Sequence, residues 1–387
     1  MITTTDRPAS AAARLPGRRP RLRRLGRGLI WAFDALIVVL GLAFFAPRAP
    51  VDPVQDLLGM IALFVPWLTG FLIAVVVIGA GTTLLLLRRG HRALSAAGAL
   101  TVLLAGLMVI VPWSAARGSW VEHFTPALSV APTATETYAP GLQVDVYLPP
   151  KPAPSRPALL YVHGGGWSSG ARADSASWFG WMADQGITVY SVDYRLAPPP
   201  RWQDAVGDVK CALGWVRSAA ARHGVTASNV SIAGDSAGGQ LAMMAAYTVG
   251  DERFPPACDV PEEPVRSVMG WYAPTDLPAL LAESGLPGAA AQAVGGYLGD
   301  QDPAVASPIT YARPGLPPTL LVQGDRDHMI PTAQATALVD RLRTAGVSAE
   351  VVTIPWAEHN FTGHWGSWGS QAMRPVVGDF LRRHVLA

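Results

Sequence analysis

Residues 234–238 read Gly-Asp-Ser-Ala-Gly and lie between an apolar run at 230–233 and a run of small residues at 239–246. A G-x-S-x-G sequence in this context is typical of a sharp turn between a buried strand and a helix, because small residues let the chain reverse tightly and expose the serine hydroxyl. Since the chain contains 39 glycines, the string alone is weak evidence. Its surroundings predict that Ser236 is a nucleophile at the end of a buried strand.

A glycine-rich turn follows an earlier apolar run at 158–162. It reads His-Gly-Gly-Gly-Trp over residues 163–167, so no side chains cover its central backbone N–H groups. Such groups stabilise the negative charge that develops on an ester carbonyl oxygen during nucleophilic attack. We expect Gly165 and Gly166, with Ala237 after the serine, to form this oxyanion hole. The alternative is a plain turn from a strand into a loop.

An activated serine needs a base, and the base needs a carboxylate to orient it. Asp327 follows the strand-like run 319–323, and His359 follows the strand-like run 349–354. The chain order Ser236, Asp327, His359 is that of the α/β-hydrolases. Because the carboxyl ends of parallel strands gather their loops at one edge, these side chains are expected to meet there. His364 is an alternative base, and His328 is expected to face solvent.

Five motifs in order resemble the hormone-sensitive-lipase-like esterases and the similar feruloyl-esterase-type bacterial hydrolases. The resemblance covers roughly residues 135–387 and rests on segments 163–167, 193–198, 234–239 and 307–310 and on the acid and histidine loops. The resemblance implies an α/β-hydrolase fold, with an eight-stranded, mostly parallel sheet flanked by helices. It also implies an enzyme that acts on carboxylic esters without a metal or organic cofactor. The family pattern Gly-x-x-Asp selects Asp327 over Asp325. Pro199 and Asn360 replace a common glutamate and glycine, and neither change removes a catalytic group.

Substrate preference is less clear from the sequence. Trp167 and Trp271 lie near the expected carboxyl edge of the sheet and, with Asp235, are candidates to line the substrate pocket. Tryptophans at such positions also serve as packing residues. No two histidines lie four residues apart, as on a zinc-binding helix.

Three apolar stretches precede this domain, at residues 29–46, 57–87 and 93–112. Each reaches or approaches the roughly 20 residues that cross a bilayer as a helix, and none has the polar face of a soluble helix. A cleaved signal in place of the first stretch is the alternative. We therefore expect a basic tail at 1–28, a membrane region with three helices at 29–113, a linker at 114–135 and a catalytic domain at 136–387.

Arginines are concentrated between residues 7 and 27 and at 88–92, on the same side of the expected spans. Positive charge stays in the cytoplasm, so the domain after residue 113 is predicted to be extracytoplasmic. Directly before an apolar span, the basic tail indicates topology rather than nucleic-acid binding. The expected partners are therefore membrane lipids and a small-molecule or lipid ester, with no nucleic acid.

The chain has 2 cysteines, Cys211 and Cys258. In an oxidising compartment they are a candidate disulfide, worth roughly 3 to 4 kcal/mol in the chain-entropy model, and two unpaired thiols are the alternative. The sequence as a whole predicts a membrane-anchored serine ester hydrolase that works through an acyl-enzyme. An acyltransferase, an amidase or peptidase on the same fold, and a non-catalytic binding protein remain the alternatives.

Overall fold

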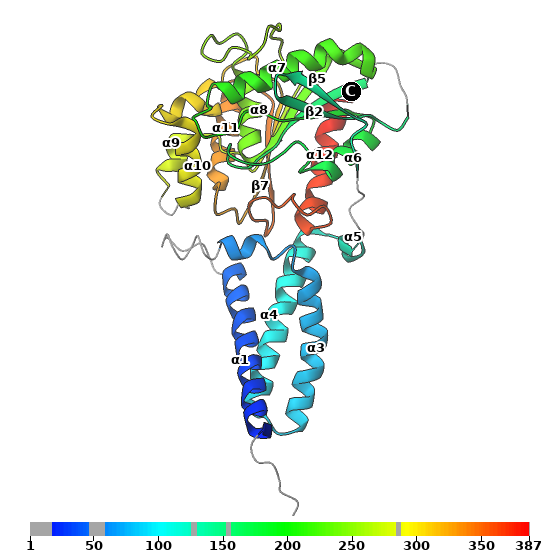
Figure 1. Cartoon of the computed structure of the whole chain (residues 1–387), viewed down its shortest axis with the longest axis vertical. Helices are drawn as coiled ribbons and strands as arrows, with labels where there is room; N and C mark the ends of the chain where they lie inside the picture. Colours follow the sequence, from blue (N-terminus) through cyan, green and yellow to red (C-terminus); the bar gives the residue numbers. More distant parts are fainter. Residues whose placement is uncertain (1–17, 46–58, 125–129, 152–155, 284–287, 387) are drawn as a thin grey trace, which may run out of the picture.

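The computed structural model describes residues 18–45, 59–124, 130–151, 156–283 and 288–386. An α/β domain stands at one end of a bundle of three long helices (Figure 1). The bundle consists of α1 (Arg18–Phe45), α3 (Thr69–Arg88) and α4 (Arg92–Ala116). A short turn at 89–91 joins α3 to α4, which lie side by side.

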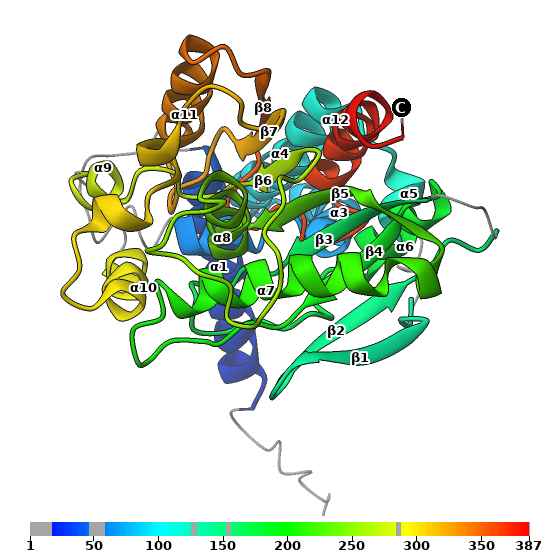
Figure 2. The ribbon, with the colours of Figure 1, turned by 90° about the horizontal axis from the view of Figure 1, so that it is seen from above.

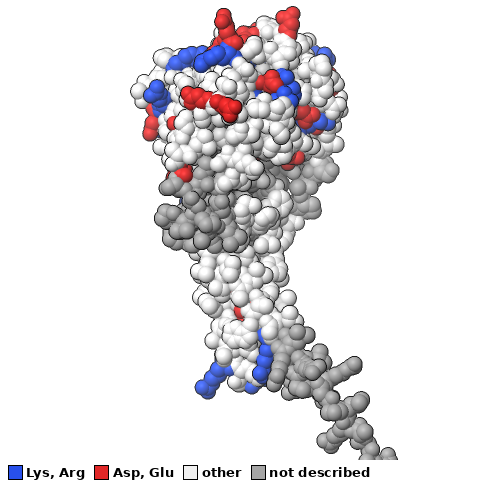
Figure 3. Space-filling view, turned by 60° about the vertical axis from the view of Figure 1, so that its left-hand side comes forward, with Lys and Arg blue, Asp and Glu red and all other residues white. Residues whose placement is uncertain are grey.

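All three helices are long and apolar enough to cross a membrane, over Gly26–Phe45, Thr69–Arg88 and Arg92–Ala116. Large apolar side chains point outward along the bundle, among them Leu29, Ile78 and Ile110. An outward-facing apolar surface of this extent is typical of contact with lipid. Figure 3 shows basic side chains at the end of the bundle farther from the α/β domain, and few charges between that end and the domain.

Within the described residues, the second apolar stretch, 57–87, is divided near Pro66 and is not one continuous helix. Residues 57 and 58 lie outside the described residues, and residues 59–63 form a separate helical turn. The chain turns through 64–68, where Pro66 has no N–H to donate, before α3 begins at Thr69. The other two helices extend beyond the expected limits of 29 and 112, to Arg18 and Ala116 respectively.

An eight-stranded sheet forms the centre of the α/β domain, in the order β1-β2-β4-β3-β5-β6-β7-β8. Strands β3 to β8 are mutually parallel; at one edge β2 pairs antiparallel with β4, and β1 pairs antiparallel with β2. This confirms the expected mostly parallel α/β sheet. The strands are β1 (Ala134–Ala139), β2 (Leu142–Tyr147), β3 (Arg156–Val162), β4 (Thr188–Val192), β5 (Val225–Asp235), β6 (Val268–Trp271), β7 (Thr319–Gly324) and β8 (Ala349–Ile354).

The expected linker at 114–135 contains regular structure. It holds the end of α4, the short helix α5 (Trp120–Phe124) and the start of β1. Thr135 pairs with Asp145 of β2 in the sheet and donates a 2.6 Å hydrogen bond to its carboxylate. The α/β domain therefore begins before residue 136. The polar Ala-Thr-Glu-Thr sequence of this edge strand hid it, because only one of its faces is covered.

Helices cover both faces of the sheet, and alternate residues of β3 show this. Leu160 and Val162 pack in one apolar cluster with α7 (Asp204–Ala219), α8 (Ser236–Tyr247) and α11 (Thr332–Thr344). Leu159 and Tyr161 pack in a second cluster with α6 (Ala176–Asp184) and α12 (Trp368–His384). Seen from above, α9 (Leu277–Leu281) and α10 (Gly288–Leu298) lie at the opposite side of the domain from β1 and β2 (Figure 2).

A disulfide joins Cys211 of α7 to Cys258 in the loop that follows α8, across a sequence separation of 47 residues. Cys211 is completely buried in the cluster beneath α7. The bond therefore ties a surface loop to a helix that is packed on the sheet.

Aromatic side chains join the bundle to the α/β domain, and we call this contact the junction. Phe44 of α1 stacks on Trp356 with ring centroids 5.5 Å apart, and Trp113 of α4 packs against Trp368 of α12. These residues belong to, or pack against, the apolar cluster that also holds the three helices together. At the rim, Glu122 forms an ion pair with Arg374. The apolar core of the bundle thus continues into the α/β domain.

Candidate active site

Ser236 lies at the turn where β5 ends and α8 begins. Its φ of 49° is in the left-handed region, which costs a non-glycine residue of order 1 kcal/mol or more. The glycines around it are required by space, because a Cβ at Gly234 would overlap the carbonyl oxygen of Gly238 and a Cβ at Gly238 would overlap that of Val162. The turn therefore presents the serine side chain above the edge of the sheet.

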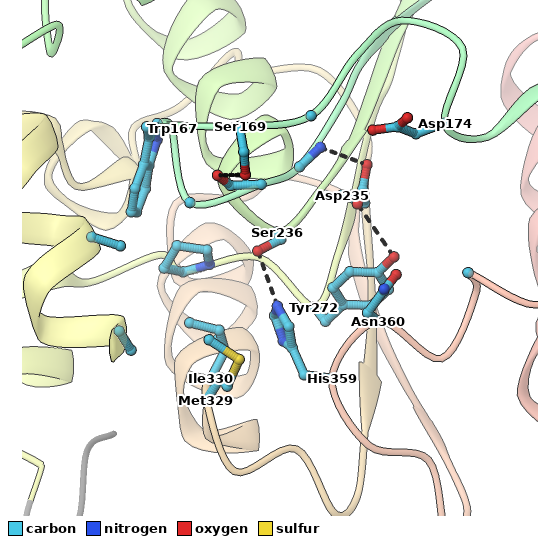
Figure 4. Close-up of a pocket in the computed structure, with 18 of the residues that line it drawn as sticks. Trp167, Ser169, Asp174, Asp235, Ser236, Tyr272, Met329, Ile330, His359 and Asn360 are labelled. Atoms are coloured by element: carbon cyan, nitrogen blue, oxygen red, sulfur yellow. Dashed lines mark hydrogen bonds between the residues drawn. The ribbon is translucent and has the colours of Figure 1, made fainter. Parts of the chain in front are cut away.

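Three side chains from separate loops meet at this edge. Ser236 Oγ lies 3.0 Å from Nε2 of His359, and Nδ1 of His359 lies 2.9 Å from Oδ2 of Asp327 (Figure 4 shows the first contact). Asp327 and His359 come from the loops after β7 and β8, as the sequence predicted. The carboxylate in contact with His359 is that of Asp327 and not that of Asp325.

Asp327 is held in place by the loop that contains it. Its Oδ1 accepts backbone N–H groups from Met329 and Ile330 at 3.0 and 2.8 Å, and Gln323 donates to Oδ2 at 2.8 Å. These three donors fix the orientation of the carboxylate, so that Oδ2 can accept from His359 in a fixed direction.

The surroundings of His359 affect its pKa in two opposing ways. Burial disfavours the imidazolium and by itself lowers the pKa, whereas the adjacent Asp327 carboxylate, with smaller contributions from Glu358 and Asp235, raises it. The net result is a pKa above the usual value of 6.5. The ring is thus a stronger base than a free imidazole, which suits a group that must take a proton from a serine hydroxyl.

The glycine turn after β3 lies beside Ser236 and lines the same cavity. Gly165 and Gly166 have φ angles of 111° and 57°, which L side chains rarely adopt. In the described part of the chain, no carbonyl oxygen accepts the N–H group of Gly165 or Gly166. These N–H groups are therefore available to an oxygen atom of a ligand.

Asp235 supports this turn from beneath. Its Oδ1 accepts the N–H of Gly164 at 3.0 Å and the hydroxyl of Tyr161 at 2.7 Å, and the Tyr272 hydroxyl lies 3.4 Å from Oδ2. Burial raises the pKa of Asp235, although the hydrogen bond from Tyr161 acts in the opposite direction. Asp235 borders the cavity, as predicted for a pocket residue, and it also fixes the start of the glycine turn.

A cavity of about 610 Å³ opens in front of Ser236. This volume is typical of a small-molecule site. Trp167 lines it, stacked on Tyr297 at 4.6 Å and with its Nε1 donating to Gln240 at 2.9 Å. Figure 4 shows Trp167 on one side of Ser236, with Met329 and Ile330 on another.

The prediction that Trp271 lines the pocket requires correction. Trp271 is completely buried in the apolar cluster beneath α6 and α12, with ring centroids 5.0 Å from Trp178 and 5.3 Å from Tyr161. Its position at the end of β6 suggested exposure to the site. The alternation of side chains along that strand instead directs it into the core.

The expectation that His328 faces solvent is also wrong. Its side chain is buried, and its Nδ1 lies 2.8 Å from Oε1 of Glu358, which also accepts the N–H groups of His328 and His359. Glu358 thus links the acid loop to the histidine loop. His364, the alternative base, packs against Trp67 and His123 at the junction.

The sequence did not indicate three residues that line the cavity: Tyr272, Asn360 and Trp67. Asn360 stands where the related esterases commonly have glycine, and its φ of 56° explains why a residue tolerant of the left-handed region occurs there. Trp67 belongs to the segment before α3, far away in the sequence, so no local pattern could connect it to Ser236. Among the described residues, no three His, Cys, Asp or Glu side chains are grouped so as to hold a metal ion.

Comparison with known proteins agrees with this architecture. The chain is 33% identical to esterase LipC of Mycobacterium tuberculosis over 223 residues, which cover 55% of this chain and 54% of the relative. It is 30% identical to esterase LipQ of the same organism over 263 residues, covering 65% and 62% respectively. The chain therefore matches only a little over half the length of these two relatives.

Solved structures and the family comparison lead to the same assignment. Esterase 2 of Thermogutta terrifontis with bound propionate superposes with a TM-score of 0.56 at 26% identity, covering 67% of this chain and 96% of that one. The BD-FAE family matches residues 144–342, which are just over half of the 387 residues and span the glycine turn, Ser236 and Asp327. With its eight-stranded sheet and esterase-like fold, the chain belongs to the BD-FAE family of α/β-hydrolases.

Proposed function

We propose that this protein is a serine carboxylic-ester hydrolase, with Ser236 as nucleophile, His359 as general base and Asp327 as the group that orients His359. The observation that carries the proposal is the continuous series of contacts, Ser236 Oγ to His359 Nε2 at 3.0 Å and His359 Nδ1 to Asp327 at 2.9 Å. The position of Ser236 beside the backbone N–H groups of the glycine turn adds support. The relatives described as esterases support the ester as substrate class.

In the proposed reaction, Ser236 Oγ attacks the acyl carbon while its proton passes to Nε2 of His359. Asp327 stabilises the imidazolium that results. The carbonyl oxygen becomes negatively charged and accepts the N–H groups of Gly165, Gly166 and Ala237. His359 then protonates the departing alcohol, and a water molecule, activated by the same histidine, releases the acid from Ser236.

The three apolar helices anchor this enzyme in a membrane, with the basic tail of residues 1–28 in the cytoplasm. In this arrangement residues 29–113 contain the membrane spans. The catalytic domain begins with β1 at Ala134, two residues before the expected boundary between the linker at 114–135 and the domain at 136–387. With three spans among the described residues and a cytoplasmic basic tail, the proposed position of the domain is extracytoplasmic. The Cys211–Cys258 disulfide supports this side, because such bonds persist in oxidising compartments.

The test is hydrolysis of p-nitrophenyl esters of increasing acyl length by the full chain in detergent, compared with Ser236→Ala. We expect turnover that the substitution reduces by at least about 10³-fold. A fluorescent organophosphonate should label the wild type at Ser236 and leave the variant unlabelled. This reagent is suggested by the T. terrifontis esterase 2 that sarin phosphonylates. Equal turnover by both proteins would refute the assignment, and labelling without ester turnover would favour an acyltransferase.

A further inference from the structure

The catalytic edge of the α/β domain faces the helical bundle. In Figure 1 the loops after β7 and β8 form the end of the domain that is nearest to the helices. Trp356, which stacks on Phe44 of α1, precedes His359 in the same loop, and Trp368 begins α12 directly after that loop. The junction thus fixes the histidine loop at the level where the apolar helices end.

Trp67 belongs both to the membrane region and to the catalytic cavity. It lies just before α3, lines the cavity in front of Ser236, and packs on His364 at 5.0 Å. Even so, its side chain is 56% exposed. One part of the cavity wall is therefore continuous with an exposed aromatic surface that leads into a membrane-spanning helix.

Residues 59–68 present an apolar outer face at this level. Met60, Phe64 and Trp67 are spaced four and three residues apart and are all exposed, whereas Ala62 and Val65 on the other side are buried. The segment contains no charged residue. In water such a face is unfavourable, but at a membrane surface it is stabilised, and tryptophan in particular favours the interface between lipid and water.

The interior of the cavity is suited to a hydrocarbon chain. Apolar side chains from α9, α10 and the loop after β7 line much of the cavity wall near Ser236. They are Leu280, Ala290, Ala293, Val294, Met329 and Ile330. Further polar side chains line the cavity, among them Asp174 and Asn360, and Figure 4 shows these two on the side of Ser236 away from Trp167. An amphiphile could therefore place its ester at Ser236 and its chain along the apolar residues of α9, α10 and the loop after β7.

From these observations we infer the substrate class: an acyl ester of a membrane lipid, which enters the cavity from the adjacent leaflet past Met60, Phe64 and Trp67. The inference rests on the ester hydrolase activity proposed above. In the reaction the bond between the acyl carbon and the ester oxygen breaks. Water supplies hydroxyl to the acyl group and hydrogen to the alcohol, so that a fatty acid and a de-acylated lipid are formed.

The test uses the full chain reconstituted into phospholipid vesicles. Three preparations carry a radiolabelled acyl chain on diacylglycerol, on phosphatidylglycerol or on phosphatidylethanolamine, and the release of labelled fatty acid is measured. Hydrolysis of p-nitrophenyl butyrate is measured in the same vesicles. The quantity compared is the ratio of the lipid rate to the rate on this soluble ester, so that differences in the amount of folded enzyme cancel.

The informative variant is Met60→Ser with Phe64→Ser, which removes two exposed apolar side chains outside the cavity. Phe124→Ser is the matched control, because Phe124 of α5 is as exposed as Phe64, at 57% against 58%, and does not line the cavity either. We expect the double variant to lower the ratio by about tenfold or more, since it loses apolar contact with lipid at the entrance. The Phe124→Ser control should change the ratio of the lipid rate to the soluble-ester rate by less than about threefold.

Different outcomes separate this inference from the proposed function. Turnover of p-nitrophenyl butyrate without fatty acid release from any of the three lipids would overturn the lipid substrate and leave the esterase intact. Equal falls in the ratio for the double variant and the Phe124 control would overturn the entrance at residues 60–67. Absence of turnover on every ester by a folded, reconstituted enzyme would instead overturn the proposed hydrolase activity.

Discussion

At the residue scale, the charges around His359 predict the pH dependence of the reaction. The Asp327 carboxylate outweighs burial and raises the pKa of His359 above 6.5. A protonated imidazole cannot accept the proton of Ser236, so kcat/KM should fall as the pH decreases through this raised pKa. The acid limb of a pH profile on a soluble ester is therefore expected above pH 6.5.

The variant Asp327→Asn tests the cause of this shift. It keeps the size of the side chain but removes its charge, so the acid limb should move to lower pH and kcat should decrease on the order of 10³- to 10⁴-fold. The measurement is the pH profile of kcat/KM for both proteins. An acid limb that stays in place in the variant would show that Asp327 does not control the pKa of His359.

A second residue-scale prediction concerns Asp235. The change Asp235→Ala removes the acceptor for the Gly164 N–H group and for the Tyr161 hydroxyl, each of which then costs about 1 to 3 kcal/mol if left unpaired. We expect kcat to fall by about 100-fold, because the N–H groups of Gly165 and Gly166 lose their fixed direction.

Steady-state kinetics and thermal unfolding check the Asp235 prediction. The control is Asp340→Ala, at an exposed aspartate of α11, which should leave kcat within about twofold. A variant with lowered Tm and unchanged kcat would mean that Asp235 only stabilises the fold.

At the element scale, the glycine turn after β3 can be tested with an added methyl group. A Cβ at Gly165 would overlap the carbonyl oxygen of Ser169, whereas a Cβ at Gly346 would meet open space. Both residues have positive φ angles, 111° and 76°, so both alanine variants should be destabilised, Gly346→Ala by about 1 to 2 kcal/mol and Gly165→Ala by more because of the overlap. Only Gly165→Ala is expected to lower kcat by about tenfold or more, and equal kcat in the two variants would contradict this role of the turn.

The contact between α7 and the loop after α8 gives the second element-scale prediction. The disulfide closes a loop with a sequence separation of 47 residues, which in the chain-entropy model stabilises the fold by about 4 kcal/mol. The variant Cys211→Ala with Cys258→Ala should therefore have a Tm lower by roughly 8 to 16 °C. Calorimetry of both proteins checks this, and an unchanged Tm would show that the bond adds no stability.

At the scale of the whole molecule, the charge distribution predicts the topology. Basic side chains lie at the far end of the bundle and the α/β domain lies at the other end (Figure 3). Because arginines remain in the cytoplasm, alkaline phosphatase fused after Ala387 should be active in a bacterial host, and green fluorescent protein fused there should be dark. A fluorescent fusion without phosphatase activity would place the α/β domain in the cytoplasm and refute the proposed orientation.

Much of the fold could be predicted from local patterns. The runs 158–162, 319–323 and 349–354 fall within β3, β7 and β8, and the three apolar stretches each contain a long helix. The prediction failed where local sequence is ambiguous. The linker was expected to reach residue 135, whereas β1 begins at Ala134, and the apolar run at 57–87 did not show that α3 would begin only at Thr69.

For the candidate site too, some residues could be predicted from local sequence and others could not. Local sequence was enough to predict Ser236, the glycine turn and the order of the acid and histidine, because tight turns and strand ends depend on residues next to one another in the chain. The burial of Trp271 and His328 and the position of Trp67 beside the cavity became clear only from the packing of the folded chain. Exposure and long-range contacts depend on which distant segments pack together, and here the junction, built from α1, α4, α12 and the loop before α12, brings the bundle of apolar helices to the catalytic edge.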